Sequence, residues 1–367
     1  RTFGHRREEL IGKHMEVLFI KETSELIAIW EGAKLTKAQA TEVSGIEHIY
    51  WHHEFDKVFK TFAFQAENFY LNSNEHTRRY IDMETAEMRF NNKLRAQFPL
   101  HKVERSAPIM HKIRSVKHPI EIDLMQQACN ITEKGFRRLL SFTKPGVMEY
   151  EIEAELIHEF VRNRSRGFAY GPIIASGHNA CVLHYIENNK PCKDGDVILL
   201  DVAAEYANYA SDMTRAIPVN GKFTKRQREV YDAVLRVMKA ATGMLKAGNT
   251  FEKYNKAVGD LMTEELLQLG LIKSDEVKNQ NPAWPAYKKY FMHGTSHFIG
   301  LDVHDVGFFA EPMQVGNAFT VEPGIYIPEE NLGIRLENNI VITEGGNIDL
   351  MKNIPLEADE IEALMNK

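Results

Sequence analysis

The sequence predicts a protein of mixed α and β structure, of the α/β (α+β) class, with two domains. Its 367 residues exceed the usual size of a single hydrophobic core. Hydrophobic residues make up 44% of the chain and charged residues 26%, which is typical of a globular protein rather than a disordered or fibrous one. In the later two thirds of the chain, blocks with helical periodicity alternate twice with blocks of strand-like residues.

The first predicted domain covers residues 1–115 and is a smaller mixed α/β domain. The stretch EVLFIKETSELIAIW at 16–30 is interpreted as two strands around a polar turn. The histidine pair in WHH, His52 and His53, is interpreted as a strand end or loop, because adjacent strand residues point to opposite faces. No obvious catalytic motif lies in this domain.

The second predicted domain, residues 116–367, begins with two helices. Pro119 suits the first turn of a helix, and apolar residues then recur at helical spacing as far as Leu140. The KPG at 144–146 ends this helix, and MEYEIEAELIHEFVRN at 148–163 predicts the next one.

Strand and turn residues follow from about 170 to 219, and two more helices are predicted at 224–248 and 250–270. Thr224 is a plausible N-cap for the first of these. The final third returns to strands and turns. The order helices, strands, helices, strands suggests a domain built from two similar halves.

Composition excludes several function classes. The net charge of -6 comes from mixed signs with no basic run, so we expect no nucleic-acid partner. Apolar stretches such as VILLDVAA at 197–204 are far shorter than the roughly 20 residues of a membrane span, so no membrane association is expected. The first ten residues lack the apolar centre of a secretory signal.

Cysteine usage indicates a reducing compartment. Cys129, Cys181 and Cys192 are an odd number and form no CxxC pair, which argues against a disulfide framework or a thiolate zinc site. Cys129 falls on the apolar face of the first predicted helix and is interpreted as a core residue. We therefore expect a cytoplasmic protein.

Two aspartates suggest a cation site. If the turn in DVAAEYANYASDMTR is centred between Tyr206 and Ala207, Asp201 and Asp212 lie opposite each other on a hairpin, with Cβ atoms about 4.5–5.5 Å apart. Carboxylates that close repel unless a proton or a cation lies between them. In the alternative interpretation, Asp212 caps a turn and Asp201 faces solvent.

Two later glutamates lie in strand-like surroundings. Glu322 precedes a Pro-Gly turn in FTVEPGIYI, and Glu337 lies within the strand-like run GIRLENNIVIT. Arg335 and Glu337 are two residues apart, so they share one face of a strand. We therefore expect Arg335 to orient substrate beside whatever Glu337 binds.

The stretch FMHGTSHFIGLDVHDVG at 291–307 contains three histidines. His293 and His297 have the spacing of the HExxH zinc helix, but the intervening GTS disfavours a helix and supplies no glutamate. In a strand, His293, Thr295 and His297 would share one face. A single histidine there could equally be a hydrogen-bonded structural residue.

Together these side chains suit a pair of cations. Four carboxylates and one histidine carry four negative charges, which balance two divalent metal ions. Oxygen-rich ligation favours Mn(2+), Mg(2+) or a similar ion. Two such ions lower the pKa of a bridging water and polarise a carbonyl, which is the chemistry of a hydrolase.

These motifs resemble the metal-dependent Xaa-Pro aminopeptidases (aminopeptidase P), in the family that also contains prolidase and methionine aminopeptidase. The resemblance runs in order through LLDVAAEYANYASDMTRAIPVNGKFT, HGTSHFIGLDVHDVG, TVEPGIYI and GIRLENNIVIT. It implies a pita-bread catalytic domain with two pseudo-symmetric halves around two Mn(2+) ions. It assigns Asp201 to one metal, His297 and Glu322 to the other, and Asp212 and Glu337 to both as bridges.

The resemblance also implies the reaction and further residues. A metal-bridging hydroxide would attack the bond between an N-terminal residue and a following proline. His184, His293 and His304 would hydrogen-bond the peptide and the tetrahedral intermediate, with Glu322 as a proton shuttle. Tyr326 and Arg335 would line the proline side of the cleft, and Asp302 and Asp305 receive no metal-binding role.

Rival functions share the fold. Prolidase, a Xaa-Pro dipeptidase, has the same five ligands, whereas creatinase-like hydrolases and non-catalytic pita-bread peptide-binding modules lack the ligand carboxylates that this chain has. The resemblance also implies a homodimer or homotetramer. The segment before Ile113 is shorter than the usual N-terminal domain of the family, so that domain is expected to be incomplete.

Overall fold

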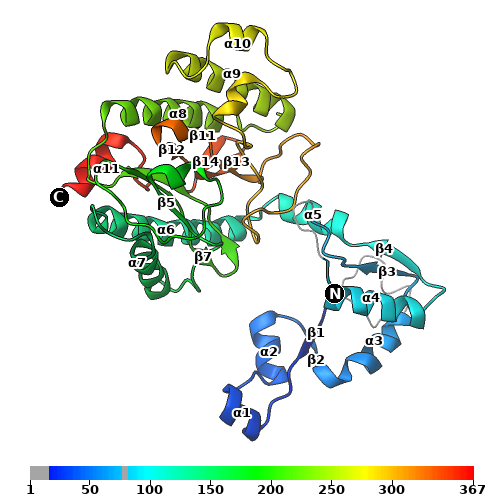
Figure 1. The fold of residues 1–367 in the computed structure, drawn as a ribbon. Coiled ribbons are helices and arrows are strands. Elements are labelled where there is room, and N and C mark those ends of the chain that lie inside the picture. The colour runs from blue at the N-terminus through cyan, green and yellow to red at the C-terminus, as the bar shows by residue number, and fades with distance from the viewer. Residues whose placement is uncertain (1–15, 77–81) are drawn as a thin grey trace. The chain divides into compact units, whose positions relative to one another are not determined.

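The computed structural model describes residues 16–76 and 82–367, and the chain divides into two compact units, residues 1–108 and 109–367 (Figure 1). The predicted class is confirmed, because helices and strands alternate through both units. The first ten residues, interpreted above as lacking a secretory signal, lie outside the described part of the chain.

The first unit contains two pairs of parallel strands with helices between them. Strand β1 pairs with β2, and β3 pairs with β4. Its small core gathers around phenylalanine rings at positions 59, 69 and 98. The elements are β1 (Val17–Ile20), α1 (Glu25–Glu31), α2 (Lys37–Ser44), β2 (His48–Trp51), a 3-10 turn at His52–Glu54, α3 (Phe55–Ala63), β3 (Asn68–Leu71), α4 (Ala86–Gln97) and β4 (Lys102–Arg105).

One sequence prediction in this unit is wrong. The second of the two strands expected within residues 16–30 is the helix α1. Ser24 starts it as an N-cap, because its hydroxyl accepts the backbone N–H of Ile27. A short apolar run has no periodicity that separates strand from helix, and the capping serine decides the outcome.

The second unit is built mainly from two helix pairs and two three-stranded antiparallel sheets, to which the two-stranded sheets β7-β8 and β11-β12 are added. Helices α6 and α7 pack against each other, as do α8 and α9. The elements before the second helix pair are α5 (Ala107–Ser115), α6 (Pro119–Phe142), α7 (Glu149–Arg162), β5 (Ile173–Ser176), a 3-10 turn at Gly177–Cys181, β6 (Val197–Asp201), β7 (Glu205–Tyr206), β8 (Tyr209–Ala210) and β9 (Thr214–Pro218).

The second half repeats this plan. It contains α8 (Lys225–Met244), α9 (Phe251–Gln268), α10 (Ser274–Lys278), a 3-10 turn at Ala286–Lys289, β10 (Ala318–Val321), β11 (Gly324–Ile327), a 3-10 turn at Pro328–Glu330, β12 (Leu332–Arg335), β13 (Asn338–Thr343), β14 (Gly346–Asp349) and α11 (Ala358–Met365). The predicted helix starts at Pro119 and after Thr224 are confirmed.

The sheets bring the two halves together. One sheet has the strand order β5-β6-β9, and the other has the order β10-β13-β14. Strand β12 pairs with β11 and also contacts β6 and β9 of the first sheet. The backbone N–H of Glu337 donates to the carbonyl of Thr214 at 3.0 Å, so the end of β12 meets the start of β9. This junction positions the carboxylates described below.

The hairpin between the two aspartates has a different register from the predicted one. Asp201 lies opposite Thr214, not Asp212. The turn is centred one residue later than expected, between Ala207 and Asn208, which both have positive φ, at 50° and 70°. Positive φ at both central positions is the geometry of a tight type I′ hairpin turn, which asparagine favours. A one-residue shift of the turn moves the opposing partner by two residues.

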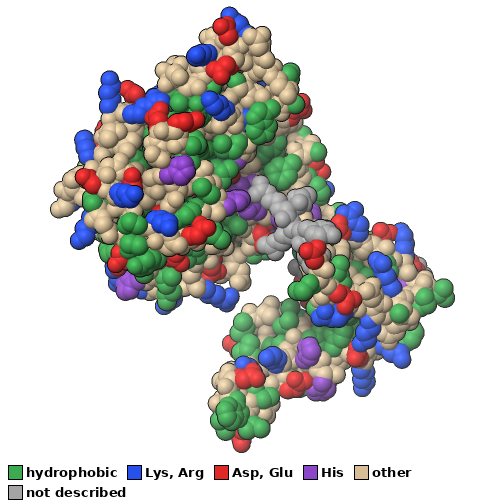
Figure 2. Space-filling model, in the orientation of Figure 1, with side chains coloured by type: hydrophobic (Ala, Val, Ile, Leu, Met, Phe, Trp, Pro, Cys, Tyr) green, Lys and Arg blue, Asp and Glu red, His purple; other side chains and the backbone are tan. Residues whose placement is uncertain are grey.

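One continuous apolar core joins the helices and sheets of the second unit, and it includes Cys129, as interpreted from the sequence. On the face shown in Figure 2, basic and acidic side chains are interspersed. Within the described ranges, none of the helices is both long and apolar enough to span a bilayer.

Two helical glycines provide a test of the packing between α6 and α7. A Cβ at Gly135 would lie 2.6 Å from the Phe160 ring, whereas a Cβ at Gly243 in α8 would have no neighbour within 4 Å. We expect Gly135→Ala to destabilise the protein by about 1–3 kcal/mol through overpacking. The matched change Gly243→Ala should stabilise it by about 0.5–1 kcal/mol through helix propensity. Thermal unfolding measures both, and equal melting temperatures for the two variants would contradict the packing.

Candidate metal centre

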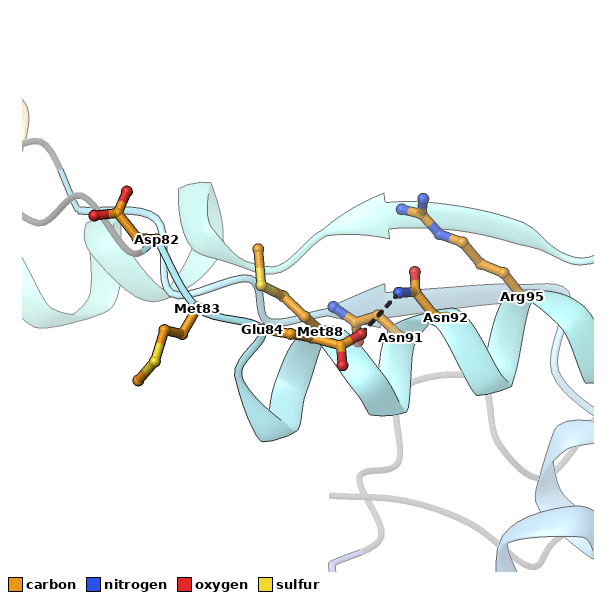
Figure 3. A pocket seen from close by; sticks show the side chains of 7 residues that line it. All are labelled: Asp82, Met83, Glu84, Met88, Asn91, Asn92 and Arg95. Carbon is orange, nitrogen blue, oxygen red and sulfur yellow. Dashed lines mark hydrogen bonds between the residues drawn. The ribbon is translucent and has the colours of Figure 1, made fainter.

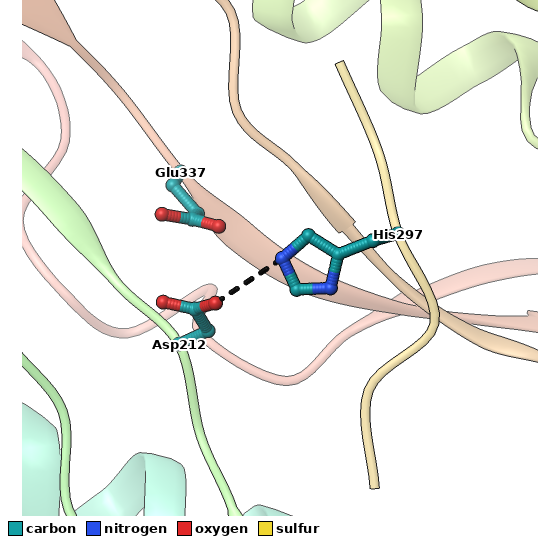
Figure 4. Close-up of side chains that lie close together, drawn as sticks. All are labelled: Asp212, His297 and Glu337. Atoms are coloured by element: carbon teal, nitrogen blue, oxygen red, sulfur yellow. Dashed lines mark ion pairs between the residues drawn. The ribbon is translucent and has the colours of Figure 1, made fainter. Parts of the chain in front are cut away.

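Three predicted ligands converge at the junction of the two halves. Asp212 lies between β8 and β9, Glu337 lies between β12 and β13, and His297 lies in an extended segment beside β10. Their side chains point toward one another (Figure 4). One ligand atom from each falls within 4.8 Å of the others, and all three residues are buried. Residues separated by up to 125 positions therefore share one site.

A fourth predicted ligand borders this cluster. Glu322 lies in the turn between β10 and β11, and its Oε1 is 3.6 Å from Nε2 of His297. The same imidazole nitrogen lies 3.4 Å from Oδ2 of Asp212. Nδ1 of His297 donates to the carbonyl of Phe298 at 2.9 Å, so in the neutral ring the proton is on Nδ1 and Nε2 is the nitrogen that can bind a cation.

The segment that carries His293 and His297 is not the strand considered from the sequence. Its backbone runs beside β10 without a regular ladder: the N–H groups of Glu322 and Thr320 donate to the carbonyls of Thr295 and His297. An isolated bridge joins Phe298 to Phe319. The glycine-containing GTS sequence disfavours a helix as expected, and tertiary hydrogen bonds hold the segment extended.

Asp201, the fifth predicted ligand, forms an ion pair beside the cluster. Its Oδ2 accepts a hydrogen bond from Nη2 of Arg335 at 2.6 Å, and its Oδ1 accepts one from the Tyr170 hydroxyl at 2.6 Å. The structure thus places Arg335 against a predicted ligand. The Arg335 side chain also donates from Nε to the hydroxyl of Thr214.

A chain of hydrogen bonds runs from Arg335 through Tyr326 to His293. Its Nη1 donates to the Tyr326 hydroxyl at 2.8 Å, and that hydroxyl lies 2.8 Å from Nε2 of His293. Nδ1 of His293 lies 2.7 Å from the carbonyl of Gly294, which can only accept. His293 is therefore the Nδ1–H tautomer, and the Tyr326 hydroxyl donates to its Nε2.

The remaining two histidines lie on loops. The His304 ring packs against the His297 ring, with centroids 4.0 Å apart. His184 is exposed, in a turn that follows the 3-10 turn at Gly177–Cys181. The fully buried carboxylate of Glu149 holds this turn, because it accepts the backbone N–H groups of Ser176 and Lys190 at 2.9 Å each.

Burial governs the protonation of the cluster. It raises the pKa of Glu322 to about 7 and that of Glu337 well above its usual value, and repulsion from Asp212 adds to both shifts. It lowers the pKa of His293 to about 3, so this ring is neutral. Burial opposes protonation of His297, but the hydrogen bond with Asp212 and the charge of Glu322 outweigh it and raise the pKa of His297.

The donor set fits a divalent cation. Oε2 of Glu337 accepts a hydrogen bond from the Thr214 hydroxyl at 2.7 Å, whereas Oε1 is buried without a hydrogen-bond partner in the described part of the chain. An unpaired buried carboxylate oxygen is costly, and a cation compensates for it. Carboxylate oxygens with one imidazole suit hard divalent ions.

Three supporting residues were not predicted. The Thr214 hydroxyl accepts a hydrogen bond from Arg335 and donates one to Glu337. The Tyr170 hydroxyl donates to Asp201. The Asn339 side chain accepts the backbone N–H of Asp212 and donates to its carbonyl. Thr214 and Asn339 each lie two residues after a predicted ligand, and this spacing was a usable signal. Tyr170 is far from Asp201 in sequence and carried none.

A separate hollow in the first unit carries none of the predicted site residues. It has a volume of about 420 Å³ and lies along α4 (Figure 3). Its lining combines acidic, amide, thioether and guanidinium groups from Asp82, Met83, Glu84, Met88, Asn91, Asn92 and Arg95. It has no histidine and no cluster of buried carboxylates, so the metal centre is assigned to the second unit.

The fold and the buried carboxylate–histidine cluster define a metal-dependent hydrolase. Residues 123–344 match the model of Metallopeptidase family M24, and residues 6–70 match that of Aminopeptidase P, N-terminal domain. The chain belongs to metallopeptidase family M24, and the resemblance drawn from its motifs is confirmed.

Individual proteins are similar over most of the chain. A Xaa-Pro aminopeptidase of Haemophilus influenzae is 37% identical over 95% of this chain and 81% of its own length. A Xaa-Pro aminopeptidase of Escherichia coli is 42% identical over 70% of this chain and 61% of its own length. The structure of an Escherichia coli aminopeptidase P variant with substrate has a TM-score of 0.84 and 35% identity, and the match covers 95% of this chain and 82% of that one.

The crowded carboxylates predict how pH affects the metal-free protein. The pKa of Glu322 is raised from 4.5 to about 7 on folding. Between these values the folded state binds more protons than the unfolded state, so the free energy of unfolding falls as pH rises, by on the order of 1–3 kcal/mol. Thermal unfolding after chelation, at about pH 5 and about pH 7.5, measures this change.

Two controls accompany that measurement. Mn(2+) should reduce the difference in thermal stability between about pH 5 and about pH 7.5, because a cation stabilises the ionised carboxylates. Glu322→Gln, which cannot ionise, should flatten the pH dependence. A chelated wild-type protein that is more stable at about pH 7.5 than at about pH 5 would contradict the raised pKa of Glu322.

Proposed function

We propose that this protein is a Xaa-Pro aminopeptidase, which removes the N-terminal residue from peptides whose second residue is proline. The observation that carries the proposal is the buried group Asp212, His297 and Glu337, in which one oxygen of Glu337 has no hydrogen-bond partner among the described residues. It occurs in a chain that is similar over nearly its whole length to a protein named Xaa-Pro aminopeptidase.

The proposed cofactor is a pair of Mn(2+) ions. Asp212, His297 and Glu337 offer ligand atoms within 4.8 Å of one another, and Glu322 lies beside His297. Asp201, the fifth proposed ligand, is paired with Arg335 beside this group. The five proposed ligands include four carboxylates, whose four negative charges equal the positive charge of two divalent cations. This charge balance supports two ions rather than one. Divalent cations bound there lower the pKa of a water and polarise the scissile carbonyl.

The protein groups supply positioning and proton transfer. Glu322, which borders His297, is proposed to accept a proton from the attacking water and return it to the leaving amine. The relay from Arg335 through Tyr326 to His293 forms a rigid wall beside the cluster. This wall suits the proline ring, because a tertiary amide with a fixed φ needs a shaped pocket rather than an N–H acceptor.

His184 and His304 complete the proposed site. The His304 ring faces His297, and His184 lies close enough to contribute to the lowered pKa of His293. Both are proposed to hydrogen-bond the peptide and the oxyanion that forms at its carbonyl.

Further proposals concern the setting of the enzyme. The three cysteines are all free thiols, which supports a cytoplasmic location. A homodimer or homotetramer is proposed from the family resemblance. Prolidase activity is the alternative. The presence of all four ligand carboxylates argues against a non-catalytic peptide-binding module.

Isosteric removal of a bridging ligand tests the metal centre. Asp212→Asn and Glu337→Gln each take away one negative charge, and we expect each to lower kcat/KM by more than the about 10–100-fold typical of residues that only orient ligands. Bound metal should fall in parallel, as measured by elemental analysis.

The matched control is Glu362→Gln. Glu362 is also buried, but it pairs with Lys222 and the backbone N–H of Phe223 in the region of α11. It should keep full activity and metal content. Full turnover with two bound ions in Asp212→Asn would refute the ligand assignment.

Peptide length separates the two candidate activities. Protein reconstituted with Mn(2+) is assayed on a Xaa-Pro dipeptide and on Xaa-Pro peptides of three or more residues, with Xaa-Ala peptides as controls. An aminopeptidase should cleave the longer Xaa-Pro peptides at least as well as the dipeptide and leave Xaa-Ala intact. Strict preference for the dipeptide would establish prolidase activity instead.

A further inference from the structure

A buried ion-pair cluster lies beneath the loop that carries His304. Asp305 is 6% exposed and Lys117 is 5% exposed, and the Lys117 ammonium donates to Oδ2 of Asp305 at 3.0 Å. Arg114 donates to Oδ1 of Asp305 and, at 2.8 Å, to Oδ2 of Asp302. The two acids that flank His304 are thus held by two cations from the junction of α5 and α6.

This junction is itself firmly anchored. The backbone N–H of Lys117 donates to the carbonyl of Gly316 at 2.7 Å, and Val116 forms an isolated bridge with Asn317. The Lys117 ammonium also donates to the carbonyl of Arg114 at 2.7 Å. Backbone hydrogen bonds to residues 316 and 317 therefore hold the segment between the two cations in place.

The loop from Gly300 to Asp305 is built around the pair. The Asp305 N–H donates to the carbonyl of Phe298 at 2.8 Å, one residue after His297. A Cβ at Gly300 would lie 2.3 Å from Oδ2 of Asp305 and 2.9 Å from Nζ of Lys117. Only glycine allows the backbone this close to the charged pair, so the glycine at position 300 is required for the loop to pack against the Lys117–Asp305 ion pair.

A buried ion pair adds little stability compared with well-packed apolar residues, so stability alone does not account for its presence. Its geometrical effect is specific, because it closes the loop on which the His304 ring reaches the His297 ring, with centroids 4.0 Å apart. We propose that Asp305, held by Lys117 and Arg114, is a positioning residue that orients His304 toward the reacting peptide. This inference rests on the aminopeptidase activity proposed above.

The kinetic test is a double-mutant cycle. A misplacement of about 1 Å can cost about 100-fold in rate, so Asp305→Asn should lower kcat by about 10–100-fold with KM and bound metal unchanged. If Asp305 acts through His304, adding Asp305→Asn to His304→Ala should cause no further loss. Additive losses, or an unchanged kcat in Asp305→Asn, would overturn the proposal.

A second readout does not depend on activity. In the metal-loaded protein, the rate at which diethyl pyrocarbonate modifies His304 is followed by peptide mass spectrometry, with the exposed His178 as internal reference. Asp305→Asn should raise the His304 rate several-fold relative to His178. Wild-type protein without peptidase activity would refute the proposed function, whereas an unchanged labelling rate would refute the positioning role.

Two further variants keep the test decisive. Arg114→Gln leaves the Lys117–Asp305 pair in place, so this variant can replace Asp305→Asn in the kinetic test if Asp305→Asn does not fold. It should show a smaller loss of kcat that also vanishes in the His304→Ala background, and additivity there would equally overturn the proposal. Glu362→Gln, a buried carboxylate paired with Lys222, should change neither kcat nor the labelling of His304.

Discussion

The mutual repulsion of buried carboxylates at the meeting of two sheets is the constraint on which the rest of the catalytic unit depends. Asp212, Glu322 and Glu337 surround one imidazole, and burial raises the pKa of both glutamates. A core that holds such a group has to be rigid enough to prevent the acids from moving apart. The repeated arrangement of helix pair and antiparallel sheet supplies that rigidity, because each half brings acids to a common edge.

The cluster is balanced by positive charge on its flank. Arg335 pairs with Asp201 and leads through Tyr326 to a neutral His293. Arg215, which is fully buried, donates to the backbone carbonyls of Thr214 and Glu337 from behind the same junction. Arg335 thus pairs with one carboxylate and Arg215 holds the backbone of Glu337, while Oε1 of Glu337 is buried without a hydrogen-bond partner among the residues that the structure describes. This asymmetry is what directs a cation to the centre.

Much of this arrangement was predictable from local sequence, because capping, helical periodicity and turn residues act over a few positions. The helix starts at Pro119 and after Thr224 followed from such signals. The errors have equally local causes: Ser24 caps a helix in a stretch read as a strand, and the turn at Ala207 and Asn208 shifts the hairpin register. Motifs selected the candidate ligands, since carboxylates within apolar strand-like runs are uncommon without a partner.

The sequence by itself determined the fold class, the alternation of helix and strand blocks in the second unit, and the set of candidate metal-binding side chains. Only the tertiary structure decided which of them meet. Asp212, His297 and Glu337 converge because β12 crosses to the first sheet, whereas Asp201 is drawn into an ion pair with Arg335. Asp305, given no metal-binding role from its motif, forms a buried ion pair with Lys117. Distances between residues far apart in the chain depend on packing, and no local pattern records them.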